Sequence, residues 1–305
     1  MSQKTGIEWT EATWNPIRGC SRVSDGCRNC YAETVAKRFS GPGQPYEGLI
    51  AKGGQWSGKV SVIDHKMDEP LRWAKPRMIF VNSMSDLFHE SVDFETIYRI
   101  MLVMQKAQHH TFQVLTKRPK RMLQFFDWWG GECKRSMAEV MPNLWLGVSV
   151  EDQKTADERI PLLLETPATI RWVSAEPLLG PVVLQGLAAG ESMEYDECRQ
   201  YLCEEGPKEN PYRDNAGRLN WIVVGGESGS GARPMHPDWA RSLRDQCVKA
   251  GVPYLFKQWG EWLPDNQNSE MSGPFDPNGA IRVGKKSAGR NLDGRKWDQF
   301  PEAGQ

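Results

Sequence analysis

The sequence predicts an α/β protein whose core is a partial (β/α) barrel of about six parallel strands, and three observations lead to this fold class. Short, almost continuously apolar runs rich in β-branched and aromatic residues recur along the chain, which is typical of strands buried on both faces. A segment with helical spacing follows most of these runs, as parallel strands require. Each run ends in ionisable or hydroxyl residues, and ligands of such folds bind at the carboxyl ends of the strands.

The expected strands are taken in chain order from their apolar composition. They span residues 78–83, 111–116, 144–149, 170–174, 221–225 and 253–257. Helical patterns follow the first two strands at about 94–108 and 119–128. Because connections between parallel strands are right-handed, consecutive units of this kind curl into a full or partial barrel.

The remaining segments complete the expected organisation. We expect one barrel domain over residues 1–264, with a cysteine-bearing loop at 14–32 and a polar, acidic insertion at about 186–220. Residues 265–305 are rich in Gly, Asn and Lys and poor in apolar residues. They are expected to form a C-terminal tail that packs on the barrel or is partly disordered. The glycine-rich residues 40–58 are expected to form a flexible loop.

Composition limits the class of protein. The 305 residues are 39% hydrophobic and 25% charged, which describes an ordinary globular protein with no membrane partner. No apolar stretch approaches the roughly 20 residues that span a bilayer, and no secretory signal peptide is recognised, so a cytoplasmic location is expected. A net charge of −1 excludes wholesale attraction to nucleic acid but leaves room for a local basic run at 116–121.

Three cysteines near the N-terminus carry the main chemical signal. Cys20, Cys27 and Cys30 lie within a Gly- and Ser-containing loop that has no apolar periodicity. Three thiolates hold three irons of a [4Fe–4S] cluster and leave the fourth iron open to a small molecule, whereas electron-carrying clusters use four cysteines. Gly19 and Gly26 each precede a cysteine, so the backbone can bend tightly around the sulfurs. An open iron points to S-adenosylmethionine chemistry.

Two other interpretations of the cysteines stay open. Free cysteines are often small buried apolar residues. A structural zinc ion is normally closed by four protein ligands, and the next candidates along the chain are His65 and Cys133. A disulfide is not expected, because seven cysteines is an odd number and disulfides are rare in the cytosol.

Polar residues at the strand ends form the second group of candidates. In chain order they are Asn82, Ser83, Ser85, Asp86, Thr116, Lys117, Arg118, Ser149, Glu151, Asp152, Ser174, Glu176, Glu227, Ser228, Lys257 and Gln258. Helix N-capping would account for some of the Ser and Asp residues. It would not account for Lys117, Glu176, Glu227 and Lys257, each of which follows a buried-looking run. We therefore interpret the set as functional.

A run of short motifs gives the chain a family resemblance. The motifs are Thr13-Trp14-Asn15-Pro16, Gly26-Cys27-Arg28-Asn29-Cys30-Tyr31-Ala32, Leu115-Thr116-Lys117-Arg118-Pro119, Gly147-Val148-Ser149-Val150-Glu151, Ser174-Ala175-Glu176-Pro177-Leu178, Gly225-Gly226-Glu227-Ser228-Gly229 and Lys257-Gln258-Trp259-Gly260. On these motifs the chain resembles the phage Gp37/Gp68-like proteins, a group similar to radical S-adenosylmethionine (radical SAM) enzymes. Such enzymes commonly leave three residues between their first two cysteines, whereas here six separate Cys20 from Cys27.

The resemblance implies an enzyme that binds a [4Fe–4S] cluster and S-adenosylmethionine. One electron from the cluster would cleave S-adenosylmethionine to methionine and a 5′-deoxyadenosyl radical, which would abstract hydrogen from a substrate. The cluster ligands would be Cys20, Cys27 and Cys30. The catalytic residues would be these three cysteines together with Lys117 and Glu176. The residues expected to bind S-adenosylmethionine are Asn82, Ser83, Asp86, Ser149, Glu151 and Glu176. Those expected to contact substrate are Lys117, Arg118, Glu227 and Lys257.

The phage connection implies modification, rearrangement or repair of a nucleotide or nucleic-acid base, for example by an isomerase or lyase in the host cytoplasm. An electron donor would be a further partner. A different class of function stays open, namely a non-enzymatic nucleic-acid-binding or adaptor protein with a structural metal at the three cysteines. A third possibility is a hydrolase that uses divalent ions bound to Asp86, Glu151, Glu176 and Glu227. The metal content of protein purified without oxygen separates the three.

Overall fold

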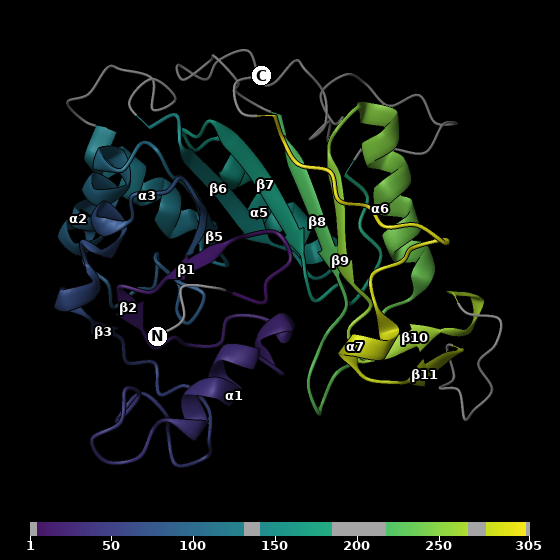
Figure 1. Ribbon diagram of the computed structural model, residues 1–305, viewed down its shortest axis with the longest axis horizontal. Coiled ribbons are helices and arrows are strands. Elements are labelled where there is room, and N and C mark those ends of the chain that lie inside the picture. Colours follow the sequence, from purple (N-terminus) through teal and green to yellow (C-terminus); the bar gives the residue numbers. More distant parts are fainter. Residues whose placement is uncertain (1–4, 131–140, 185–217, 268–278, 303–305) are drawn as a thin grey trace. The chain divides into compact units, whose positions relative to one another are not determined.

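A computed structural model describes residues 5–130, 141–184, 218–267 and 279–302 (Figure 1). The expected insertion at 186–220 lies outside these residues apart from its last three positions. The described chain forms two compact units. The first comprises Met1–Val148 with Glu165–Thr169, and the second comprises Ser149–Leu164 with Ile170–Gln305.

The main sheet has seven strands. They are β1 (Ala12–Trp14), β4 (Met78–Val81), β5 (Thr111–Thr116), β6 (Leu144–Ser149), β7 (Ile170–Ala175), β8 (Trp221–Gly225) and β9 (Tyr254–Gln258), in the order β1-β4-β5-β6-β7-β8-β9. Within this sheet, the strands follow one another in chain order. Strands β1, β4, β5 and β6 run parallel to one another, and so do β7, β8 and β9. A doubly wound sheet would reverse its order at a switch point. The predicted partial (β/α) barrel is therefore confirmed.

The strand count exceeds the prediction by one, because β1 was not among the expected strands. Ala12–Trp14 has only three residues, too few for an apolar run to stand out. Its ends are nevertheless fully buried, and it pairs with β4 in the register Ala12 to Ile79 and Trp14 to Val81. The other six strands match the predicted ranges closely because their apolar runs are four to six residues long.

The first unit places the cysteine loop directly after β1. Its helices are α1 (Tyr31–Arg38), α2 (Phe94–Lys106) and α3 (Pro119–Gly130), with short 3₁₀ turns η1 (Asp25–Cys27), η2 (Asp64–Lys66) and η3 (Glu69–Arg72) and a small sheet of β2 (Ile17–Arg18) and β3 (Ser61–Val62). Asp93 caps α2 by accepting a hydrogen bond from the Thr96 amide at 2.6 Å, which satisfies an otherwise orphaned donor. In Figure 1, α1 lies on the other side of β1 from α2 and α3.

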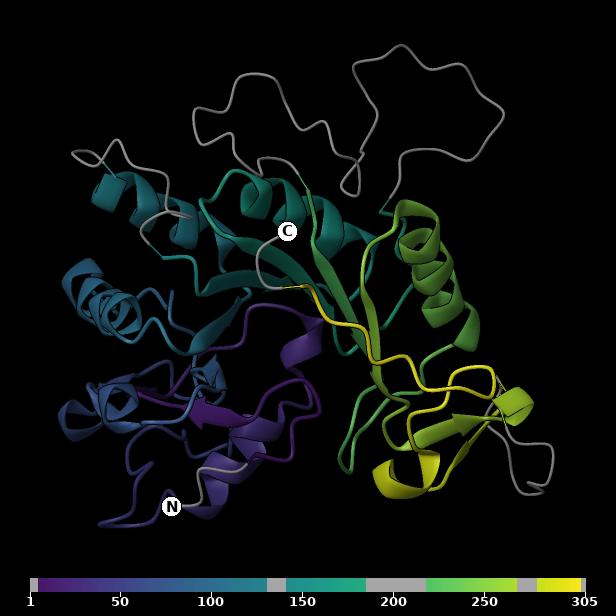
Figure 2. The ribbon, with the colours of Figure 1, turned by 45° about the horizontal axis from the view of Figure 1, so that its top comes forward.

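The second unit contains the last strands and the C-terminal segment. Its remaining elements are α5 (Gln153–Leu164), α6 (Pro237–Ala250), α7 (Lys285–Ala288), η4 (Asp265–Gln267), β10 (Trp262–Pro264) and β11 (Ala280–Arg282). Residues 289–299 run along β9, as the yellow trace shows in Figure 2. The Phe256 amide donates to the Trp297 carbonyl at 2.9 Å, and the Trp221 indole donates to the Gln299 carbonyl at 2.8 Å. This segment covers the last strand of the sheet, where backbone groups would otherwise lack partners.

One carboxylate fastens this C-terminal segment to α6. Asp293 accepts hydrogen bonds from Arg241 Nε at 3.0 Å and Arg241 Nη2 at 2.8 Å, and it also pairs with Arg244. The hydrogen bonds from Arg241 hold the pKa of Asp293 well below its usual range. Burial opposes this effect, and Arg244 adds to it. Asp293 therefore remains ionised in the folded protein at pH values where the unfolded chain takes up a proton.

Substituting Asp293→Asn is expected to lower the free energy of unfolding by about 1 kcal/mol at pH 7, since the group is partly exposed and solvent screens the pair. A lowered pKa stabilises the folded state above the unfolded pKa of about 3.9, and this contribution disappears as the pH falls through the folded pKa. Denaturant titrations at pH 7 and below pH 4 should show the difference shrink in acid. Asp238→Asn is the matched control, because Asp238 also pairs with Arg241 but is more exposed and should cost less.

No helix in the part of the chain that the structure describes is both long enough and apolar enough to cross a membrane.

Candidate functional site

The cysteine loop leaves the carboxyl end of β1 and is fastened to the segment that follows β4. Asn15 Oδ1 accepts hydrogen bonds from Ser83 Oγ at 3.2 Å and from the Met84 amide at 3.0 Å. Ser85 Oγ donates to the Ile17 carbonyl at 2.9 Å. Gly19 has a φ of +92°, and a Cβ there would lie 2.2 Å from the Lys59 carbonyl oxygen, so only glycine fits. The start of the loop is therefore fixed in place by side-chain hydrogen bonds and by the main-chain conformation at Gly19.

The three thiols of the loop are free, partly exposed neighbours. The turn η1 ends at Cys27, and α1 begins directly after Cys30. The pKa of Cys20 is raised to about 12, chiefly by burial and then by Asp86, with small contributions from Cys30 and Cys27, while Arg118 opposes the rise. Burial also raises the pKa of Cys30, with a contribution from Cys27. The thiols would release protons on binding a metal.

The donor set fits an iron–sulfur cluster. Thiolates are soft ligands that select Fe–S clusters, zinc or copper(I). Within the described ranges, no three His, Cys, Asp or Glu side chains are grouped closely enough to hold a single metal ion as they stand. The cysteines of one short loop, with an apolar wall beside Cys20 and Cys30, offer the ligands that three irons of a [4Fe–4S] cluster would need.

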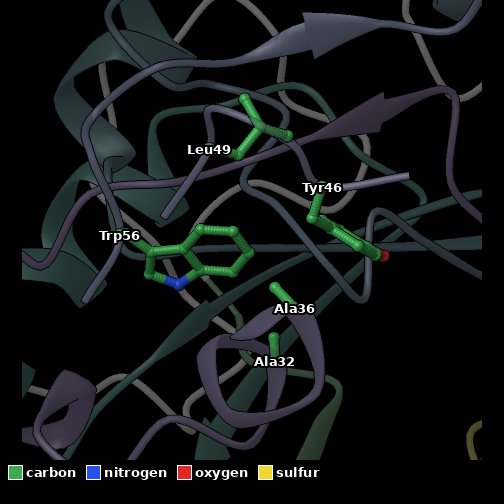
Figure 3. Packing of buried hydrophobic residues seen from close by; sticks show 5 residues of the cluster. All are labelled: Ala32, Ala36, Tyr46, Leu49 and Trp56. Atoms are coloured by element: carbon green, nitrogen blue, oxygen red, sulfur yellow. The ribbon is translucent and has the colours of Figure 1, made fainter. Parts of the chain in front are cut away.

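The apolar wall comes from residues 40–58, which differ from the flexible loop expected there. Tyr46, Leu49 and Trp56 pack with Ala32 and Ala36 of α1 into one buried cluster (Figure 3). Cys20 and Cys30 pack against the same cluster. The glycine content of the segment serves its tight turns, while Tyr46, Leu49 and Trp56 are buried. This wall limits the access of water to the sulfurs, and such burial is one of the means by which proteins set the properties of a cluster.

Asp86 joins the carboxyl ends of β4 and β5. Its Oδ1 accepts from Thr116 Oγ1 at 2.7 Å and from the Phe88 amide at 3.0 Å. Its Oδ2 accepts from the Lys117 amide at 3.1 Å and from Arg118 Nη1 at 3.0 Å. Each carboxylate oxygen thus has two donors, and the side chain is only 8% exposed. Asp86 is fully engaged within the protein.

Arg118 connects this strand-end network to the cysteine loop. Its Nη2 donates to Ser21 Oγ at 2.7 Å and to the Ser21 carbonyl at 3.2 Å, and its Nη1 lies 4.0 Å from Cys20 Sγ. Its Nε donates to both oxygens of Glu90 at 2.9 Å. Burial acts to lower the pKa of Arg118, but Asp86, Cys20 and Glu90 together raise it, so the guanidinium stays charged. One buried cation therefore holds the loop from the end of β5.

His89, Ser21 and Glu90 belong to this network but were not among the predicted residues. The Ser91 amide donates to His89 Nδ1 at 3.1 Å, so the proton of the neutral ring lies on Nε2, which donates to Ser21 Oγ at 3.0 Å. Burial, and then Arg118, lowers the pKa of His89 and keeps the ring neutral. Nothing in the sequence marks these residues beyond their nearness to Asp86 and Cys20.

Asn82 carries a side-chain amide that is buried and unpaired within the described chain. It follows β4, is 3% exposed and has a φ of 60°. Both atoms of its side-chain amide are buried without a hydrogen-bond partner among the described residues. Buried polar atoms are almost always paired in native proteins, and an orphaned donor and acceptor on one amide indicate a missing partner. A ligand that offers both a donor and an acceptor would satisfy Asn82.

A second group of predicted residues lies in the second unit. Lys257 Nζ donates to both carboxylate oxygens of Glu176, at 2.8 and 2.9 Å. Gln258 Nε2 donates to Glu176 Oε1 at 3.2 Å and to the Gly226 carbonyl at 3.3 Å, while Gln258 Oε1 is buried without a partner in the described chain. A Cβ on Gly226 would lie 1.9 Å from the Trp259 carbonyl oxygen, so β8 and β9 approach closely just past their ends.

Arginines hold the other predicted carboxylates of this unit. Arg233 pairs with Glu227 through Nη2 at 2.7 Å and Nε at 2.9 Å. Arg159 Nη1 donates to Glu151 Oε1 at 3.2 Å and to the Ser149 carbonyl at 2.8 Å. Both carboxylates are at least 95% buried.

The predicted residues are therefore divided between the two units. The first contains Cys20, Cys27, Cys30, Asn82, Ser83, Asp86, Lys117 and Arg118, and the second contains Ser149, Glu151, Glu176, Glu227 and Lys257.

Comparison with known proteins gives a family and a distant structural likeness. The sequence profile of a family described as "Protein of unknown function (DUF5131)" matches residues 4–301. No curated protein matches the chain. Among solved structures, the chain is similar to a spore photoproduct lyase mutant at 10% sequence identity, with a TM-score of 0.38 over 82% of this chain and 65% of that one. The chain thus spans a little under two thirds of the length of that protein.

Proposed function

We propose that this chain, which belongs to the family described as "Protein of unknown function (DUF5131)", is a radical SAM enzyme that binds a [4Fe–4S] cluster through Cys20, Cys27 and Cys30. The observation that carries the proposal is the position of the three thiols. They lie on a loop that follows the first strand of a partial (β/α) barrel and is fastened to the ends of β4 and β5. The ends of parallel strands are where such folds bind cofactors and substrates.

The bound cluster would supply one electron for the cleavage of S-adenosylmethionine, which yields methionine and a 5′-deoxyadenosyl radical that takes hydrogen from the substrate. The protein's part is to bind and orient. Asn82 is proposed to bind the amino-acid end of S-adenosylmethionine, which carries both donors and acceptors, with Ser83 beside it. Asp86 was predicted to bind this cofactor and Arg118 to contact substrate. Because they are engaged with each other, we assign both to holding the cysteine loop.

Residues of the second unit are proposed as further ligands of the cofactor and the substrate. Ser149, Glu151 and Glu176 are the candidates for S-adenosylmethionine, and Glu227 and Lys257 for the substrate. Two of the three hydrogens of Lys257 Nζ are directed at Glu176, so the ammonium retains one for a ligand. Gln258 Oε1, a buried acceptor without a partner in the described chain, adds a position for a ligand donor.

The proposed substrate is a nucleotide or a nucleic-acid base, acted on in the cytoplasm. Within the basic run at 116–121, Arg118 is buried and Arg121 is directed at the Val92 carbonyl and the Phe94 ring. Lys120 is exposed and Lys117 partly exposed, so these two lysines are the candidates for a phosphate group.

The proposal is tested by reconstituting the protein with iron and sulfide in the absence of oxygen. We expect about four irons per chain and, with a reductant, slow formation of 5′-deoxyadenosine and methionine from S-adenosylmethionine without substrate. Stoichiometric zinc that iron cannot replace would overturn the proposal in favour of a structural metal.

The role of Asn82 has a test of its own in Asn82→Gly. Glycine adopts the φ of 60° without strain, so the substitution removes the amide while leaving the fold and the iron content unchanged. Affinity for S-adenosylmethionine should fall at least about fivefold, because a typical lost hydrogen bond costs about 0.5–1.5 kcal/mol and two atoms are affected. Calorimetric titration of the reconstituted protein measures this. An unchanged affinity with a full complement of iron would remove Asn82 from the binding site.

A further inference from the structure

The cysteine loop and α1 carry an excess of positive charge in a chain whose net charge is −1. Residues 18–59 contain seven Lys and Arg against three Asp and Glu, which leaves the rest of the chain with a charge of −5. The Arg22–Glu33 ion pair neutralises one charge of each sign. The acidic residues that remain are Asp25 and Glu47, both exposed. The stretch of chain that carries the three thiols therefore has a net positive charge.

The exposed side of α1 is part of this charged region. Ala32, Glu33 and Ala36 form the buried side of the helix. At 100° per residue, the exposed positions 31, 34, 37 and 38 fall on the opposite side, within one third of a turn. Lys37 and Arg38 give this side its charge, and Tyr31 OH is held by the Ser83 carbonyl at 2.6 Å.

We define the basic face as Arg28, Lys37 and Arg38 with the exposed apolar residues Val23, Tyr31 and Phe39. The apolar members are 42%, 50% and 49% exposed. Arg28 lies between Cys27 and Cys30, and Tyr31 follows Cys30 directly. The basic face is therefore continuous in sequence with two of the three thiols.

We propose that the basic face is the docking surface for an acidic one-electron carrier protein, an inference that rests on the proposed function. In the transfer, the reduced flavin of the carrier loses one electron and the cluster gains it, and no bond forms or breaks. Cationic side chains would steer an acidic partner to the loop, and exposed apolar side chains among them supply the contact area of a protein–protein interface. A nucleic-acid backbone is instead met by cations and polar donors, and the apolar half of this surface would gain nothing from phosphate.

The test uses reconstituted full-length protein and flavodoxin, an acidic flavoprotein. Reversing the charge with Arg28→Glu, Lys37→Glu and Arg38→Glu should weaken flavodoxin binding at least about tenfold at low ionic strength. Cluster reduction by reduced flavodoxin, followed by absorbance, should slow by a similar factor and lose its salt dependence. Reduction by photoreduced deazaflavin, a small uncharged reductant, should keep its rate. The iron content should also stay constant.

A second triple variant serves as the matched control. Lys154→Glu, Lys249→Glu and Lys286→Glu make the same change in net charge on exposed positions of the second unit, and flavodoxin binding should change less than twofold. Equal weakening by both triple variants would mean that only net charge matters and would overturn the docking surface. The docking surface would also be overturned if the Arg28, Lys37 and Arg38 variant lost duplex DNA binding but kept flavodoxin binding. If the reconstituted protein takes up no iron, that result contradicts the proposed function itself and is distinct from a failure of docking.

Discussion

Replacing any one of Cys20, Cys27 or Cys30 by alanine is expected to abolish the brown colour and most of the iron of the anaerobically reconstituted protein. The three partly buried thiols lie on one short loop, so removing one leaves two ligands for a cluster that needs three. Formation of 5′-deoxyadenosine from S-adenosylmethionine should fall below detection in each variant. Iron analysis, absorbance and product chromatography measure the three quantities on the same sample.

Cys247 supplies the matched control for this experiment. It is fully buried on α6 in the second unit, and burial raises the pKa of its thiol to about 12. A buried, protonated thiol is a poor metal ligand, so Cys247→Ala should keep about four irons at the cost of a small cavity. Cys133, Cys198 and Cys203 lie outside the described residues and are likewise predicted to be dispensable. A Cys20, Cys27 or Cys30 variant that retained four irons would contradict the assignment of ligands.

The parts of the fold that could be predicted from sequence are those that local composition determines. Six strands were recognised because an apolar run of four or more residues between polar ends is a local signal. The three-residue β1 carries too little signal, although it is the strand from which the cysteine loop begins. The glycine-rich residues 40–58 have the composition of a flexible loop, and only the fold brings their Tyr46, Leu49 and Trp56 onto α1.

The sequence shows which strand-end residues are charged, but it does not show which of them form ion pairs with each other. Asp86 and Arg118 are 32 positions apart, and Glu176 and Lys257 are 81 apart, so each pair forms only when the sheet assembles. Side chains engaged in these ion pairs have fewer hydrogen-bonding positions left for a ligand. Asn82 shows the opposite case, because an ordinary strand-end asparagine became a strong candidate once both amide atoms were seen to be buried without partners in the described chain.

The pairing of Asp86 with Arg118 has a consequence for how the loop is held. The Arg118 side chain contacts Cys20, Ser21, Asp86 and Glu90 together. Its planar fork of donors suits this task, since a lysine in its place offers a single point of attachment. The position of the first cysteine is therefore set through the ends of β4 and β5 rather than by the loop alone.

Replacing Arg118 with methionine is expected to destabilise the protein by about 3–5 kcal/mol, because it leaves the carboxylate of Asp86 buried without its cation. Denaturant titration of the iron-free protein gives the free energy of unfolding. Arg118→Lys is the conservative control and should retain the charge while losing the contacts to Ser21. Adding Asp86→Asn to Arg118→Met should recover part of the stability, since no unpaired buried charge then remains.

The double variant separates stability from positioning. If Arg118 orients Cys20 and Ser21, the Asp86→Asn, Arg118→Met protein should regain much of its stability yet keep an altered cluster, seen as a shifted midpoint potential and a changed electron paramagnetic resonance spectrum. Arg118→Lys should lie between this protein and the unmodified one in both properties. If the double variant instead recovers stability together with the native potential and spectrum, Arg118 serves only as the charge partner of Asp86. The cysteine loop would then hold its cluster without help from Arg118.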